Sequence, residues 1–238
     1  MKVDILAFGA HPDDVELSSA GTLVKQKLLG YKTAIVDLTR GELGTRGSAE
    51  IRDEEATNAA KIMKVDAREN LGLPDGFFEQ DKESVLRIIE MVRKYQPRIV
   101  LANAYSDRHP DHGRGSSIVS RACFLAGLPK IETSLDGINQ KAWRPKAIYH
   151  YIQYNSIEPD FAIDITGHLD TKLDAILAYK SQFYDPNSKE PNTPISNKEF
   201  LNAITFRAEE YGKYMGVKHA EAYNVERLPG VDDLFHLL

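Results

Sequence analysis

The stretch VDILAFGAHPDDVEL, residues 3–17, joins a short apolar run to a cluster of polar side chains and decides the fold class. Its first six residues are typical of a strand that is covered on both faces, as in a parallel sheet. Residues 33–38 and 98–103 are similar apolar runs. The segments between these runs predict helices over Asp14–Leu29, Ser48–Met63 and Lys82–Tyr95. This order predicts a Rossmann-like α/β fold with a mostly parallel sheet and helices on both faces.

Later segments extend this order. We predict further helices over Ser116–Leu125, Leu169–Phe183 and Lys198–Met215, and strands over Ala147–Ile152 and Phe161–Ile165. Residues 128–145 and 184–197 are typical of loops, and loops of this length often act as lids or contact surfaces. Because neither is a domain linker, we expect a single domain over residues 1–238.

Composition and charge limit the class of protein. The chain is 42% hydrophobic and 27% charged, which is typical of a globular protein. Its net charge of −5 argues against a general nucleic-acid binder. No apolar stretch approaches the roughly 20 residues that span a bilayer, and we find no signal peptide. The single cysteine, Cys123, fits a reducing compartment. We therefore expect a cytoplasmic protein without nucleic-acid or membrane partners.

Polar clusters follow three of the predicted strands. They are His11-Pro12-Asp13-Asp14-Val15-Glu16, the segment TRGELGTRG at 39–47, and Asp107-Arg108-His109-Pro110-Asp111-His112. In an open parallel sheet, the ligand site lies in the crevice beyond the carboxyl ends of the strands. We therefore expect the three clusters to meet at one edge of the sheet.

The residue types in two of these clusters suit a metal ion. Imidazole nitrogen and carboxylate oxygen bind Zn²⁺, and a catalytic zinc keeps three protein ligands and one open position. His11, Asp14 and His112 could supply this set. Asp13 would then be free as a general base, and His109 could stabilise or protonate a developing charge.

Each of these residues also has an ordinary structural explanation. A single His-Pro is more often a loop histidine bonded to backbone, and an aspartate before a helix is most often an N-cap. The second His-Pro-Asp-His could likewise be a turn followed by a cap. What favours metal binding is that all of them are expected at one edge of the sheet.

Arginines near the same edge have two interpretations. Arg52 either pairs with Asp53 or Glu55 on its own helix, or it directs its donors at substrate hydroxyls or a carboxylate. Four further arginines surround the acidic clusters: Arg40, Arg46, Arg108 and Arg114. They indicate an anionic group on the substrate, although solvated loop arginines are the commoner explanation.

The motifs AHPDDVE at 10–16 and HPDH at 109–112 together resemble the PIG-L/LmbE-type zinc deacetylases, which remove the N-acetyl group from N-acetylglucosamine conjugates. The resemblance covers essentially the whole chain. It continues through GELGTRGS at 41–48, IRDEEATNAA at 51–60, NLGLPDG at 70–76 and SQFYDPNSKEPNTPIS at 181–196. These stretches are most similar to the bacillithiol-biosynthesis branch, whose substrate is N-acetylglucosaminyl-malate.

The resemblance implies a metal-dependent amidohydrolase with a Rossmann-like fold and one catalytic Zn²⁺, for which Fe²⁺ or another divalent ion could substitute. It also implies a small glycoconjugate as substrate and a homo-oligomer, a hexamer or a trimer. In this chain His11, Asp14 and His112 match the zinc ligands. Asp13 matches the general base, and His109 matches the histidine that stabilises the tetrahedral intermediate.

Other positions are assigned by the resemblance or depart from it. Asp111 matches a residue that orients a neighbouring histidine, and Arg52 lies in the motif that contacts sugar hydroxyls. We assign Arg108 to a carboxylate on the aglycone. Asp107 stands where mycothiol-branch relatives have a tyrosine, so an oxyanion assisted by tyrosine is not expected. His219 is interpreted as a structural surface histidine.

Alternatives remain at two levels. A nucleotide-dependent Rossmann enzyme is disfavoured because the first strand–helix turn has no G-x-G-x-x-G and its carboxylates would repel a pyrophosphate. An inactive sugar-binding relative is disfavoured because the histidines and aspartates of both motifs are intact. Within the deacetylases, a chitooligosaccharide is the alternative to the malate conjugate.

Overall fold

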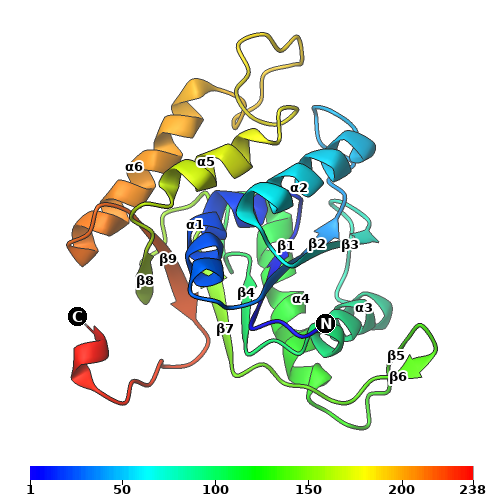
Figure 1. Cartoon of the computed structure of the whole chain (residues 1–238). Helices are drawn as coiled ribbons and strands as arrows, with labels where there is room; N and C mark the ends of the chain where they lie inside the picture. The colour runs from blue at the N-terminus through cyan, green and yellow to red at the C-terminus, as the bar shows by residue number, and fades with distance from the viewer. Residues whose placement is uncertain (238) are drawn as a thin grey trace.

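The centre of the molecule is a mixed sheet, described in a computed structural model that covers residues 1–237 (Figure 1). Within these residues the sheet has seven strands in the order β3-β2-β1-β4-β7-β9-β8. Their bounds are β1 (Ile5–Gly9), β2 (Thr33–Thr39), β3 (Ala67–Leu73), β4 (Ile99–Ala102), β7 (Ala147–Tyr151), β8 (Phe161–Asp164) and β9 (Ala220–Val225). Among these seven, β9 alone points in the opposite direction to the others, and it pairs antiparallel with β7 and β8. The predicted mostly parallel, Rossmann-like sheet is confirmed.

Helices cover both faces of this sheet. They are α1 (Asp14–Leu28), α2 (Ala49–Met63), α3 (Lys82–Tyr95), α4 (Pro110–Ala126), α5 (Leu169–Leu177) and α6 (Lys198–Met215). Side chains alternate along a strand, and β1 shows the result. Leu6 and Phe8 join the core under α3 and α4, whereas Ile5 and Ala7 join the core under α1, α2 and α5. Helix α6 packs at the antiparallel end of the sheet, against β9 and β8.

Several predicted boundaries were wrong. The helix expected from Ser116 already begins at Pro110, because proline is favoured in the first turn of a helix. The helix expected to reach Phe183 ends at Leu177. After it, Ser181 donates from its backbone N and from Oγ to Glu55 of α2, both at 2.7 Å. These bonds to α2 replace a continuation of the helix.

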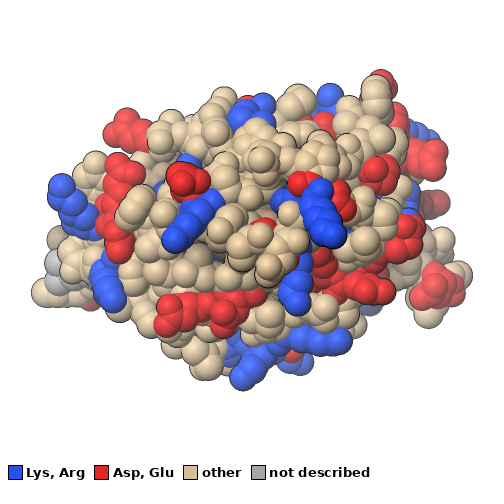
Figure 2. Space-filling view, turned by 90° about the horizontal axis from the view of Figure 1, so that it is seen from above, with Lys and Arg blue, Asp and Glu red and all other residues tan. Residues whose placement is uncertain are grey.

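Two peripheral elements complete the described chain. A small hairpin of β5 (Ser134–Leu135) and β6 (Ile138–Asn139) lies in the predicted loop 128–145, and a 3₁₀ helix spans Leu234–Leu237. Among the helices of residues 1–237, none combines the length and the apolar character that a membrane span requires. The face seen from above in Figure 2 carries basic and acidic side chains interspersed, with no continuous field of one sign.

Candidate active site

A cavity of about 560 Å³ opens beyond the carboxyl ends of β1, β2 and β4. All but one of the site residues expected from the sequence line it: His11, Asp13, Asp14, Arg52, Arg108, His109 and His112. The exception is Asp111, which is fully buried behind them. The three polar clusters therefore do meet at one edge of the sheet.

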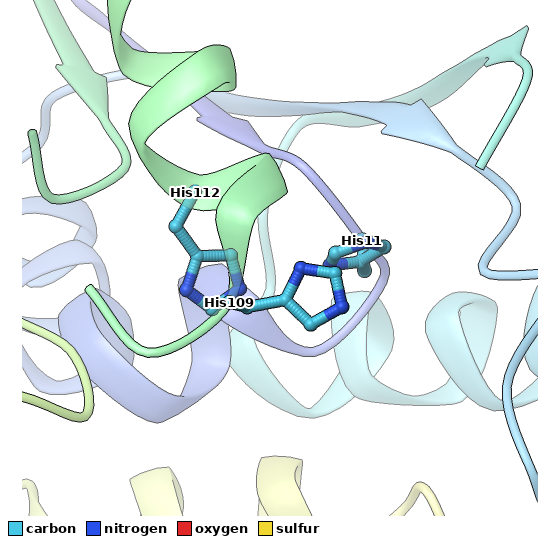
Figure 3. A group of neighbouring side chains, drawn as sticks. All are labelled: His11, His109 and His112. Atoms are coloured by element: carbon cyan, nitrogen blue, oxygen red, sulfur yellow. The ribbon is translucent and has the colours of Figure 1, made fainter. Parts of the chain in front are cut away.

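Three imidazoles converge in this cavity. His11 lies in the loop after β1, and His109 and His112 come from the beginning of α4 (Figure 3). The ring centroids are 4.6 Å apart for His11 and His109, and 5.2 Å apart for His109 and His112. One ring nitrogen from each residue lies within 4.8 Å of the other two. Such a group of nitrogens is close enough to hold one metal ion.

The Asp14 carboxylate lies between two of these rings. Its Oδ1 is 3.1 Å from His112 Nε2, and its Oδ2 is 3.7 Å from His11 Nδ1. Two buried amides orient it: Asn103 Nδ2 donates to Oδ2 at 2.9 Å, and Gln153 Nε2 donates to Oδ1 at 3.0 Å. Sequence reasoning missed both amides. The same strand-end signal could have found them, because Asn103 follows β4 and Gln153 follows β7 closely.

Carboxylates also contact the outer nitrogens of the two histidines. His11 Nε2 lies 3.0 Å from Asp75 Oδ1 and 3.4 Å from Asp111 Oδ2. His112 Nδ1 lies 2.5 Å from Asp107 Oδ2. A carboxylate at the outer nitrogen orients the ring and increases the basicity of the inner nitrogen, as around protein metal ions. The donor chemistry of His11, Asp14 and His112 therefore fits a divalent metal.

Asp111 and Asp75, which both contact His11, come from different elements. Asp111 lies in the first turn of α4, where its Oδ2 accepts a hydrogen bond from Gly76 N at 2.8 Å and its Oδ1 accepts one from Arg114. Its neighbouring histidine is His11, which belongs to the other motif. Asp75 follows β3 and was missed because β3 itself was not predicted.

Asp13 has an unusual backbone conformation. It stands at the N-cap of α1 with φ of 114°, and its side chain makes no capping hydrogen bond. Its Oδ2 instead accepts a hydrogen bond from Arg52 Nη2 at 2.7 Å. Burial raises the pKa of Asp13 to about 7, against the opposing effect of the Arg52 charge. The interpretation of Asp13 as a simple helix cap is therefore wrong.

Arg52 is almost wholly buried and its donors are directed inward. Besides Asp13, it donates to Pro12 O at 3.0 Å and to Gly41 O at 3.3 Å. The helix pairs considered from the sequence do not form, because Asp53 pairs with Arg40 and Glu55 binds Ser181. Since Arg52 also lines the cavity, a contact with substrate stays a prediction.

A backbone hydrogen bond determines which ring nitrogen of His109 carries the proton. Its Nδ1 accepts a hydrogen bond from Asp111 N at 3.2 Å and so caps α4. Burial, reinforced by the neighbouring His11 and His112, lowers the pKa of His109 below its usual value. A neutral ring whose Nδ1 accepts must carry its proton on Nε2. His109 is therefore a hydrogen-bond donor beside the other two imidazoles.

Arg108 and one of the two predicted loops form outer parts of the cavity. Arg108 is exposed, and its guanidinium carbon lies 4.8 Å from the centre of the Tyr154 ring. Of the two predicted loops, 184–197 contributes Thr193, Pro194 and Ile195 to the cavity wall, whereas none of the lining residues comes from 128–145. His219 is 6% exposed, so its interpretation as a surface residue was wrong.

Comparison with known proteins places this site in a family. The family model described as GlcNAc-PI de-N-acetylase, PIG-L, matches residues 6–123, which include both histidine motifs. The chain belongs to the PIG-L family. The crystal structure of a conserved protein from Thermus thermophilus is similar over 97% of both chains, with a TM-score of 0.84 and 35% identity.

Relatives of known or assigned activity are similar to this chain over most of its length. The diacetylchitobiose deacetylase of Thermococcus kodakarensis is 28% identical over 95% of this PIG-L chain and 84% of its own length. A probable N-acetyl-α-D-glucosaminyl L-malate deacetylase of Bacillus subtilis is 26% identical over 90% of this chain and 98% of its own. The 4-oxalmesaconate hydratase of Pseudomonas putida is 25% identical over 74% and 73%.

These findings establish the class of the protein. Family, fold and a histidine–carboxylate group able to hold a metal make it a metal-dependent amidohydrolase of the deacetylase type. At family level its substrates are conjugates of the N-acetylglucosamine type. The hydratase relative shows that the fold also supports a different reaction.

Proposed function

We propose that the protein hydrolyses the N-acetyl group of an N-acetylglucosamine conjugate and releases acetate and the free amine. In this proposal His11, Asp14 and His112 hold a divalent ion. Because the donors are imidazole nitrogens and a carboxylate oxygen, we expect this ion to be zinc. Convergence of three imidazoles and Asp14 in one cavity is the observation that carries it. The single domain, the homo-oligomer and the cytoplasmic location expected from the sequence belong to the same proposal.

The chemistry divides between the ion and the chain. A divalent ion bound by this group would acidify a water molecule and polarise the acetyl carbonyl. Asp13 takes the proton of the attacking water, and its position supports this role because Arg52 donates to Oδ2, whereas Oδ1 accepts no hydrogen bond from the residues that the structure describes. His109 Nε2–H donates to the negative charge that develops on the carbonyl oxygen. Asp13 or His109 then returns a proton to the departing amine.

The positioning residues act through their contacts. Asp75 and Asp111 orient His11, and Asp107 orients His112, so each ring presents its inner nitrogen towards Asp14. Arg52 orients Asp13 and reaches sugar hydroxyls with its remaining donor capacity. These roles support hydrolysis rather than simple sugar binding, because a binding protein does not require a proton acceptor beside the metal group.

The aglycone is proposed to be acidic, with malate as the best candidate and a chitooligosaccharide as the alternative. Arg108 is exposed at the cavity and, among the ion pairs of the described residues, has no carboxylate partner. We expect Arg108→Ala to raise KM for an N-acetylglucosaminyl-malate conjugate about tenfold or more, because a hydrogen bond to a charged group is lost. KM for free N-acetylglucosamine should change little. Equal effects on both substrates would contradict this role.

Acetate release from a panel of N-acetylglucosamine conjugates, with and without chelator, tests the whole proposal. We expect turnover of at least one conjugate, its loss with chelator and its recovery with Zn²⁺. Turnover that resists chelator would exclude the metal mechanism. A metal-loaded protein that cleaves no conjugate would instead support a sugar-binding relative, and hydration of 4-oxalmesaconate by the same sample would support the hydratase reaction.

A further inference from the structure

A buried histidine outside the cavity contacts the residue that orients Asp14. His150 belongs to β7, between β4 and β9 in the sheet (Figure 1), and is 5% exposed. Its Nδ1 lies 2.9 Å from the backbone oxygen of Asn103 and 2.9 Å from Ser116 Oγ of α4. Its Nε2 lies 3.0 Å from Oε1 of Glu226, which follows β9. His150, Ser116 and Glu226 do not line the cavity, and no step of the proposed mechanism uses them.

Asn103 connects the two histidine motifs. Its Oδ1 accepts a hydrogen bond from Ala10 N at 2.9 Å, next to His11, and its Nδ2 donates to Asp14 Oδ2 and to Gln153 Oε1, both at 2.9 Å. The orientation of this amide is fixed, because a backbone N–H can only donate and an ionised carboxylate can only accept. A displacement of Asn103 would therefore move Asp14 and the loop that carries His11 together.

The partners of His150 determine where its protons lie. Asn103 O and an ionised Glu226 carboxylate can only accept, so both ring nitrogens face acceptors, and the doubly protonated ring satisfies both. Although burial opposes it, hydrogen bonds with His150 and Ser120 lower the pKa of Glu226, which keeps this carboxyl ionised. Ser116 Oγ could donate to Nδ1 if this nitrogen lost its proton, and Asn103 O would then lose its donor.

We propose that His150 is a positioning residue for the metal group: it donates from Nδ1 to Asn103 O and thereby holds the Asn103 amide against Asp14. Glu226 acts on the same path by keeping the ring protonated. The inference rests on the proposed function, because it takes Asp14 to be a ligand of the ion. Direct partners of a ligand contribute about 10–100-fold to metal affinity, and His150 acts one step further out, so we expect about three- to tenfold.

Two substitutions of His150 separate this role from packing. His150→Asn can still place an amide N–H near Asn103 O, whereas His150→Leu has no donor. We expect Kd for Zn²⁺, measured by competition with a chromophoric chelator, to rise about three- to tenfold in His150→Leu and to stay within about twofold of wild type in His150→Asn. Thermal unfolding of the metal-free proteins measures the structural cost separately. A loss of packing alone would lower this Tm without changing Kd.

Two further variants test the partners of the ring. Ser116→Ala removes the other contact of Nδ1 but leaves Asn103 O in place, so it is the matched control and should keep the wild-type Kd. Glu226→Gln lies at an exposed position and removes the charge that favours the doubly protonated ring. It should raise Kd in the same direction as His150→Leu.

A spectroscopic measurement on the wild-type protein does not depend on whether any variant folds. ¹⁵N spectra of histidine-labelled, metal-free protein at neutral pH report which ring nitrogens carry a proton. We expect Nδ1 and Nε2 of His150 both to be protonated in the wild type, and Nδ1 to lose its proton in Glu226→Gln. An unprotonated Nδ1 in the wild type would contradict the inference, because the ring could not then donate to Asn103.

The outcomes distinguish this inference from the proposed function. If the wild type binds Zn²⁺ and His150→Leu binds it equally well, His150 has no part in the metal group and the deacetylase proposal stands. Equal losses of affinity in His150→Leu and His150→Asn would show that the donor to Asn103 is not the cause, and they would also overturn the inference. A wild-type protein that binds no Zn²⁺ overturns the proposed metal mechanism and the inference with it.

Discussion

Asp13 is the residue at which backbone strain, burial and charge meet. A non-glycine residue at φ of 114° costs on the order of 1–3 kcal/mol and persists only where its surroundings impose it. An ordinary N-cap would have no such strain and would bind the first amides of α1. The observed conformation instead places the Asp13 carboxylate against Arg52 in the cavity wall. We therefore attribute the backbone strain to the positioning of the Asp13 carboxylate and not to stabilisation of α1.

Replacing Asp13 tests its role as a base. We expect Asp13→Asn to lower kcat by about 10²–10⁴-fold, because the amide keeps the size and can still accept from Arg52 but cannot take a proton. KM and metal content should stay close to the wild-type values. The measurement is steady-state kinetics together with metal analysis of the same sample. Near-wild-type kcat with metal bound would remove Asp13 as the base.

Asp107 allows a separate test of the metal group. We expect Asp107→Asn to weaken metal affinity about 10–100-fold, since His112 loses the carboxylate that orients its ring. Competition with a chromophoric chelator measures this affinity directly. Asp170→Asn, at an exposed position in the first turn of α5, is the control and should leave affinity unchanged. Equal metal affinity in the two variants would contradict the assignment.

A buried charge cluster joins three elements, β3, β2 and α1, to the segment that follows α5. Arg68 of β3 donates to both oxygens of Asp37 on β2, at 2.8 and 2.9 Å, and it also pairs with Glu16 of α1. Tyr179, just after α5, donates to the same Glu16 at 3.0 Å. Glu16 is the acid that ends the first motif. It supports the site through the packing of α1 and does not contact the histidines.

Removal of Arg68 should destabilise the whole sheet edge. We expect Arg68→Met to lower the free energy of unfolding by about 3–5 kcal/mol, because two buried carboxylates lose their partner. Denaturant unfolding measures the change. Lys27→Met, which breaks the more exposed pair with Asp66, is the control and should cost far less. A similar small cost for both substitutions would show that Arg68 is not needed to offset the buried charge.

The elements that the sequence predicted correctly are those with a strong apolar period. β1, β2, α3 and α6 have continuous apolar runs or clear helical periodicity, and their bounds were predicted within a few residues. β3 has the sequence ARENLGL and mostly half-exposed side chains, so it contains no apolar run. β9 has the sequence AEAYNV and is buried. Its polar residues Glu221 and Asn224 form hydrogen bonds with residues far away in the sequence, and a local sequence pattern does not indicate such partners.

Whether a site residue was predicted from the sequence depended on whether its strand was predicted. Residues beyond predicted strands were found together in the cavity, because parallel strands end at one edge whatever their loops do. Asp75 follows the missed strand β3 and was therefore missed with it. Arg52 was placed in the correct region, but its inward hydrogen bonds depend on the left-handed conformation of Asp13. No local sequence pattern specifies that conformation.

At the scale of the whole molecule, we expect metal binding at the proposed site to contribute to the stability of the folded protein, because carboxylates are gathered there. Five of them gather around the histidines: Asp13, Asp14, Asp75, Asp107 and Asp111. An ion at about one hundred times its Kd stabilises the folded state by about 2.7 kcal/mol. For a chain of this size, that corresponds to a change in Tm of about 5–10 °C.

Chelation should therefore lower both stability and activity. We expect Tm to fall by about 5–10 °C with chelator and to return when Zn²⁺ is added, as measured by circular dichroism. The His112→Ala protein, which lacks one proposed ligand, should show a much smaller response to chelator. If chelator changes neither Tm nor turnover of the wild-type protein, the metal group has no role in this molecule.

The pairing of β1 with β4 also determines when the site can form during folding. His11 follows β1 and His112 belongs to α4, which follows β4, and the two strands pair through Ile5 and Ile99. Contacts between such distant segments require closure of a long loop and form late relative to local helices. The segment before β4 cannot assemble the ligand set alone. If His11 and His112 hold the metal as proposed, metal uptake during refolding is expected to report the central long-range step.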